Sequence, residues 1–311
     1  GRYYPEFYDF LSSMTRIPSM ITDPAVLVLH NQSTFPSSVV PANITTLIVI
    51  GNYSPAELNY ADFTNLVTLK MFDGTMTSDL RTQVTNLITA NVLQSLEIPI
   101  WGTTSFSGGG QTNIRTISGF HDVTHIGGFG GSQIRTLTGF ENVVYCGGFN
   151  YAEVLSSLPP MLNLRTVSSW CFDATWKFRV FTVSDLLSSV GEGGFYNSMI
   201  HTVNMVLRKM PSNSLVTACS LLRNTKCTVN PSTLNFSIGA DVVENVPNIT
   251  AYVNEVLDIA LDAVPFKNAT SRTLDLSSVV ANTTGLTQHG GLIDVIKIGS
   301  SSYTWNGSAW A

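Results

Sequence analysis

The sequence predicts a strand-rich α/β protein: a short, irregular solenoid of stacked repeats, then an α/β region and a C-terminal β-hairpin. Two observations lead to this prediction. A 20-residue segment is followed at once by a copy with nine identical positions, and the apolar pattern changes to helical spacing after about residue 183. We expect four parts, an N-terminal cap segment, the solenoid, the α/β region and the hairpin, over residues 1–40, 41–185, 186–290 and 291–311.

The duplicated segments are residues 113–132 and 133–152, which share Ile-Arg-Thr, Gly-Phe and Gly-Gly-Phe. A looser kernel, two apolar residues three apart, recurs along the first half of the chain. Its first positions are Ile44, Leu66, Leu93, Ile114, Ile134 and Leu164. A short strand with alternate residues inward, followed by a return segment, produces such a period, and so small a unit buries its apolar side chains only by stacking on neighbours. We therefore expect Phe120, Phe129, Phe140 and Phe149 to form core rows.

The repeats resemble a known family. Leu-x-x-Leu-x-Leu spacing, together with Gly-Phe-x-x-Val-x-x-apolar-Gly-Gly-Phe in the two clear units, is similar to the irregular BspA-like leucine-rich repeats of bacterial surface proteins and phage. The resemblance covers about residues 40–185. It implies a short, irregular leucine-rich-repeat-like solenoid of stacked strands and a role in attachment.

The remaining elements follow from local patterns. Phe7, Phe10, Leu11 and Met14 lie at helical spacing within 5–14, which predicts a capping helix. Further helices are predicted over 197–210, 214–222 and 250–264, and strands over 233–238, 273–277 and 292–298. The chain then turns and forms a last strand over 303–310, with a second turn at Asn306-Gly307.

Low charge is the main feature of the composition. Charged residues make up 12% of the chain, the net charge is −5, and Ser 33, Thr 34 and Asn 23 replace the missing charges. Soluble domains usually carry about 25% charged residues. An acidic chain without a basic stripe is a poor nucleic-acid binder. No apolar stretch approaches the ~20 residues of a membrane-spanning helix, so we expect no membrane insertion.

No sequence motif for catalysis is present. The chain contains no Gly-x-Ser-x-Gly elbow, phosphate loop or Cys-x-x-Cys pair, and His121 and His125 lie in a repeat context that favours exposed surface over a zinc site. We therefore expect no catalytic residues, no metal and no cofactor. Cys219 and Cys227 lie close enough in sequence to pair, although free thiols are favoured.

Aromatic residues supply the candidate binding site. Trp101, Tyr303, Trp305 and Trp310 lie in low-charge surroundings, where ring faces stack on sugar C–H faces and Ser, Thr and Asn bond hydroxyls. The alternative is that these rings are core or subunit-contact residues. The ending Tyr-x-Trp-Asn-Gly-Ser-Ala-Trp resembles the C-terminal ends of phage tail-fibre and related virion proteins.

These observations favour a non-enzymatic virion or cell-surface attachment protein, such as a phage fibre, tail or decoration subunit. The expected location is the virion or the extracellular surface. The expected partners are other copies of the chain or other virion subunits, and a host-surface receptor that is a glycan or a protein. A bacterial surface adhesin with BspA-like repeats is one alternative. A glycan-degrading phage spike, with two carboxylates from neighbouring turns acting on a glycosidic bond, is another.

Overall fold

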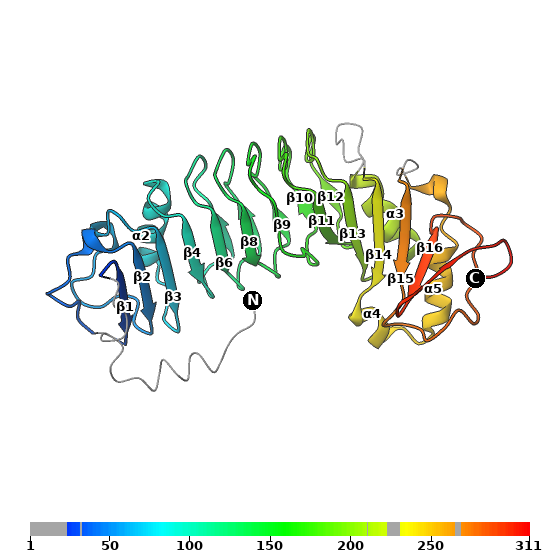
Figure 1. The fold of residues 1–311 in the computed structure, drawn as a ribbon, viewed down its shortest axis with the longest axis horizontal. Coiled ribbons are helices and arrows are strands. Elements are labelled where there is room, and N and C mark those ends of the chain that lie inside the picture. Colours follow the sequence, from blue (N-terminus) through cyan, green and yellow to red (C-terminus); the bar gives the residue numbers. More distant parts are fainter. Residues whose placement is uncertain (1–23, 32, 210, 223–230, 265–268) are drawn as a thin grey trace. The chain divides into compact units, whose positions relative to one another are not determined.

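The computed structural model describes residues 24–31, 33–209, 211–222, 231–264 and 269–311. Its folded segments form two compact units, one ending at Phe140 and the other beginning at Glu141. Both are strand-rich with parallel sheets and a few helices (Figure 1), as the predicted fold class requires. The predicted helix within 5–14 lies outside the described residues. The predicted division of the chain into four parts, 1–40, 41–185, 186–290 and 291–311, remains a prediction.

The first unit contains a six-stranded parallel sheet and a smaller pair of strands. The sheet is ordered β1 (Val26–His30), β2 (Thr46–Ile50), β3 (Thr68–Phe72), β4 (Ser95–Ile98), β6 (Thr116–Gly119) and β8 (Thr136–Gly139), and the pair is β5 (Ser105–Ser107) with β7 (His125–Gly127). The repeat kernel sets the register of the sheet, because its apolar residues pair in one row: Leu47, Leu69, Leu96, Ile117 and Leu137. Buried apolar rows of this kind supply most of the stabilisation of such a sheet.

The phenylalanine rows of the repeats are buried as predicted. Phe120, Phe129, Phe140 and Phe149 are all fully buried. The rings of Phe120 and Phe140 stack with centroids 5.1 Å apart and planes at 7°. Helix α2 (Ser78–Thr89), which the polar sequence of this stretch did not predict, begins where the Thr77 side chain accepts a hydrogen bond from the Leu80 N–H.

The second unit contains two sheets. One is the parallel set β9 (Tyr145–Cys146), β10 (Thr166–Val167) and β12 (Ser189–Val190). The other runs β11 (Val180–Ser184), β13 (Thr202–Leu207), β14 (Thr233–Ile238), β15 (Ser271–Asp275), β16 (Val295–Ile298) and β17 (Ser301–Thr304). It is parallel except for β16 and β17, which form an antiparallel final hairpin. The predicted bounds of that hairpin were wrong, because β16 begins at Val295 rather than at 292 and β17 covers 301–304 rather than 303–310. Strand β14 has the bounds predicted, 233–238, whereas β15 lies two residues before the predicted 273–277, and the two strands pair in parallel.

Helices α3 (Pro211–Leu222), α4 (Ala240–Asn245) and α5 (Ile249–Leu257) complete this unit. Figure 1 shows α3 and α5 on one face of the six-stranded sheet, and the two helices contact each other. Helix α3 confirms the prediction over 214–222. The predicted helix over 250–264 was too long, because α5 ends at Leu257 and a short 3-10 turn, η4 (Leu261–Ala263), follows it.

The predicted helix over 197–210 was wrong, because this stretch contains strand β13. Its apolar residues satisfy helical spacing, but Val203, Met205 and Leu207 also alternate with half-buried Thr202, Asn204 and Val206. Parallel pairing with β11 on one side and β14 on the other favours the strand, in which alternate side chains are buried, over the helix.

Candidate functional site: a pocket beside the C-terminal hairpin

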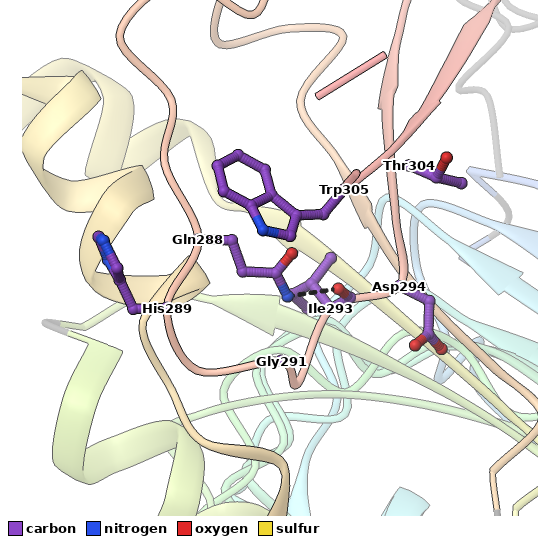
Figure 2. A pocket seen from close by; sticks show the side chains of 7 residues that line it. All are labelled: Gln288, His289, Gly291, Ile293, Asp294, Thr304 and Trp305. Carbon is purple, nitrogen blue, oxygen red and sulfur yellow. Dashed lines mark hydrogen bonds between the residues drawn. The ribbon is translucent and has the colours of Figure 1, made fainter. Parts of the chain in front are cut away.

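A pocket of about 330 Å³ lies where the final hairpin meets the segment that leads into β16. Its lining residues are Gln288, His289, Gly291, Ile293, Asp294, Thr304 and Trp305. The first five precede β16, Thr304 ends β17 and Trp305 follows it, so antiparallel pairing of the hairpin holds the two halves of the pocket together. In Figure 2 the Trp305 ring lies over the Gln288 side chain, with His289 to one side and Asp294 to the other.

Trp305 is held by its partner across the second turn. Trp305 and Trp310 form an antiparallel bridge, and their rings lie 5.5 Å apart at 59°. Asn306 closes the turn between them, because its side-chain oxygen accepts hydrogen bonds from the Ser308 and Ala309 N–H groups. Trp310 is buried, whereas Trp305 is half-buried and contributes to the pocket wall. Trp310 therefore supports the ring that a ligand would meet.

Gln288 provides a hydrogen-bond acceptor at the pocket. Its side-chain N–H donates to the Ile293 carbonyl at 2.8 Å, which fixes the amide. The residue is only 7% exposed, and its other amide atom, Oε1, is buried and has no hydrogen-bond partner among the described residues. A buried acceptor without a partner is costly.

Asp294 and His289 supply the polar edges. Asp294 Oδ1 lies 2.8 Å from Arg272 Nη2, and Arg272 also donates to the Leu292 carbonyl, so the carboxylate is fixed in place. His289 Nδ1 hydrogen-bonds Asp258 Oδ1 at 2.8 Å. Gly291 leaves the pocket open between them, since a Cβ there would meet no atom within 4 Å. The site thus combines one aromatic face with several fixed polar groups.

The predicted binding residues divide into two groups. Tyr303, Trp305 and Trp310 come together on the final hairpin, although only Trp305 lines the pocket. Trp101 lies in the first unit, where it is buried against Phe106 and Phe120, and its indole N–H donates to the Ser105 carbonyl. Trp101 is therefore a core residue, which was the alternative interpretation of these aromatic side chains.

Sequence reasoning missed Gln288, His289 and Asp294 as pocket residues. Each is an isolated polar residue without a motif, and only the parallel placement of β15 beside β16 brings Arg272 to Asp294. Among the described residues no group of three or more His, Cys, Asp or Glu could hold a metal ion. Within the same residues no helix has the length and apolar character needed to cross a membrane.

Comparison with known proteins gives little beyond this geometry. No protein-family profile matches the chain, and no curated protein sequence does either. A crystal structure of a leucine-rich cell surface protein from Faecalibacterium prausnitzii A2-165 is similar at 12% identity, over 89% of this chain and 88% of that one, with a TM-score of 0.21. So low a TM-score carries no argument about fold or function. The function must be argued from the residues of the chain itself.

Proposed function

We propose that this chain is a non-enzymatic attachment protein of a virion or a bacterial cell surface. Its repeats would form a leucine-rich-repeat-like solenoid, followed by an α/β region and a terminal hairpin. The pocket under Trp305 would bind a neutral sugar of a host-surface receptor. Other copies of the chain or other virion subunits stay proposed partners.

The observation that carries this proposal is the pairing of the Trp305 ring with the unpartnered Gln288 carbonyl oxygen in one pocket. A ring face stacks on the C–H face of a pyranose, and the fixed carbonyl accepts a hydrogen bond from a hydroxyl. Asp294 is the one carboxylate among the lining residues, and it is already paired with Arg272. Glycoside hydrolysis in most families uses two carboxylates, so the lining favours binding over cleavage.

Arrayed neutral and acidic glycans, probed with the purified chain, test the proposal. We expect binding to one or more neutral glycans, and Trp305→Ala should weaken it about tenfold or more, equivalent to ~1.4 kcal/mol. Trp176→Ala is the matched control, because Trp176 is also exposed but does not line the pocket. Absence of glycan binding, or release of shortened glycans by the chain, would contradict the proposal.

A further inference from the structure

A turn motif recurs through the second unit and extends beyond the duplication seen in the sequence. Residues 147–151 read Gly-Gly-Phe-Asn-Tyr and residues 193–197 read Gly-Gly-Phe-Tyr-Asn. Residues 170–174, Trp-Cys-Phe-Asp-Ala, form the turn between them. The rings of Phe149 and Phe172 stack at 5.6 Å, and those of Phe172 and Phe195 at 5.2 Å, both with planes at 16°.

Backbone hydrogen bonds relate the three turns to one another from the phenylalanine onward. The Phe149 N–H donates to the Cys171 carbonyl, and the Phe172 N–H donates to the Gly194 carbonyl. The fifth residue of each turn has a left-handed backbone, with φ of +58° at Tyr151, +56° at Ala174 and +51° at Asn197. The middle turn can therefore be compared with the next turn position by position, and with the preceding turn from Phe149 onward.

Trp170 departs from the motif at the first position, where the next turn has Gly193. Its φ is +55° and that of the equivalent Gly193 is +65°. A left-handed backbone is unfavourable for a bulky side chain, and glycine is the ordinary residue there. Phe120 and Phe140 also have positive φ, but both are fully buried. Trp170 is 45% exposed, so burial offsets much less of the strain.

The Trp170 ring forms an aromatic corner with the next turn. The ring lies so close to Gly193 that a Cβ there would collide with it. It meets the Tyr196 ring edge to face, with centroids 5.7 Å apart and planes at 80°. Tyr196 is 42% exposed and Tyr151, on the preceding turn, is exposed as well. Exposed aromatic side chains thus lie on three consecutive stacked turns.

Asp173 adds a polar group to the same turn. Its N–H donates to the Trp170 carbonyl, and its own carbonyl accepts from the Tyr151 N–H. Asp173 is 7% exposed, and its buried Oδ1 has no hydrogen-bond partner among the described residues. A buried carboxylate oxygen without a donor calls for an explanation, and a bound ligand that opens this turn and brings a hydroxyl to Oδ1 would provide one.

We infer that Tyr151, Trp170, Asp173 and Tyr196 form a second carbohydrate-binding surface, the aromatic turn surface, which takes a neutral glycan. Ring faces stack on pyranose C–H faces, and the carboxylate accepts hydrogen bonds from sugar hydroxyls. Local strain retained at a half-exposed ring marks a position kept for function rather than for folding. This inference takes its class of ligand from the proposed function and adds a site separate from the Trp305 pocket.

The test uses the full chain, with arrayed neutral oligosaccharides followed by calorimetry on the strongest glycan found. Trp170→Gly introduces the residue that the next turn has at this position, so its melting temperature should equal or exceed that of the wild type, while its affinity falls about tenfold or more. Asp173→Asn should weaken binding as well. Trp176→Ala, which changes an exposed tryptophan that makes no ring contact with Trp170, should bind like the wild type.

Two outcomes would overturn the inference: unchanged affinity in Trp170→Gly, whatever its melting temperature, or binding of tetramethylammonium in place of any glycan, which would indicate an aromatic cage for cations. The experiment can disprove either of the two proposed sites independently of the other. If only Trp305→Ala weakens binding, the aromatic turn surface is wrong and the pocket stands. If only Trp170→Gly weakens it, the pocket is wrong. If the wild type binds no glycan, both are wrong.

Discussion

Single residues show most clearly where sequence reasoning stops. Trp101, Trp305 and Trp310 have the same side chain and similar neutral surroundings in sequence, yet Trp101 and Trp310 are buried and Trp305 lines a pocket. The difference arises from tertiary contacts: Phe106 and Phe120 cover Trp101, whereas Trp305 covers Trp310. An aromatic-rich ending therefore indicated the hairpin that lines the pocket, but no property of the sequence indicated which ring is accessible.

Asp275 at the end of β15 gives a prediction about pH. Its Oδ1 accepts a hydrogen bond from the Ser277 hydroxyl at 2.6 Å and another from the Ser277 N–H at 2.9 Å, and Lys297 adds attraction. These contacts lower the pKa of the Asp275 carboxyl below its usual range. The carboxylate is favoured in the folded state, so its contribution is complete above the unfolded-state pKa of about 3.9 and is lost as pH falls through the lower folded-state pKa.

The measurement is urea unfolding of the wild type and of Asp275→Asn at about pH 7 and about pH 3. The wild type should lose more stability between these conditions than the variant does, by less than about 1 kcal/mol because the group is exposed to solvent. Ser277→Ala should reduce the pH dependence in the same direction. Equal pH dependence in the wild type and in Asp275→Asn would contradict the assignment.

At the scale of elements, a strand or helix was predicted correctly when more than one sequence pattern indicated it. Strand β14 and the final hairpin have alternation together with turn residues, and both were predicted. Strand β13 has alternation and helical spacing at once, so its sequence alone was ambiguous. Helix α2 has little apolar character and depends on its Thr77 cap and on the packing of Leu80, Val84 and Ile88.

The glycines that end the repeat strands give a prediction about stacking. Gly119 and Gly139 pair across β6 and β8, and both have positive φ, +97° and +81°. A Cβ at Gly139 would collide with the carbonyl oxygen of Gly119. Gly139→Ala should therefore reduce the free energy of unfolding by about 1–3 kcal/mol, since strain and backbone collision act together.

Gly110→Ala separates these two effects. Gly110 has a φ of +79°, close to that of Gly139, but a Cβ there would meet nothing within 4 Å. Denaturant unfolding of both variants should show the smaller loss in Gly110→Ala, because only backbone strain remains. An equal loss of unfolding free energy in the two variants would contradict this explanation, because it would mean that collision with the neighbouring strand adds nothing to the cost of a side chain at position 139.

At the scale of the whole molecule, low charge agrees with the chemistry of both proposed sites. The stretches 24–56 and 298–311 contain no Lys, Arg, Asp or Glu, and the second of them includes the pocket residue Trp305. Parallel strands of neutral residues stack without like-charge repulsion between successive repeats. A surface of hydroxyls, amides and rings also leaves stacking and hydrogen bonding as the main sources of affinity for a partner.

This chemistry predicts how binding depends on salt. A protein that binds through charge loses affinity steeply as salt rises, because salt screens the charges and counterion release contributes less. Stacking on a ring and bonding to a fixed carbonyl involve no such release. We therefore expect the affinity for the strongest neutral glycan to change less than about twofold between about 0.05 M and 0.5 M NaCl. Calorimetry across this range checks it.

Acidic glycans provide the internal control for the salt experiment. The net charge of −5 repels them, so any binding of a sialylated or sulfated analogue of the same glycan should strengthen as salt rises and screens that repulsion. The two ligands thus respond differently to salt while stacking on the same rings. A tenfold loss of affinity for the neutral glycan at high salt would show that charged contacts dominate, and binding would then have to be assigned to basic side chains rather than to Trp305 and Trp170.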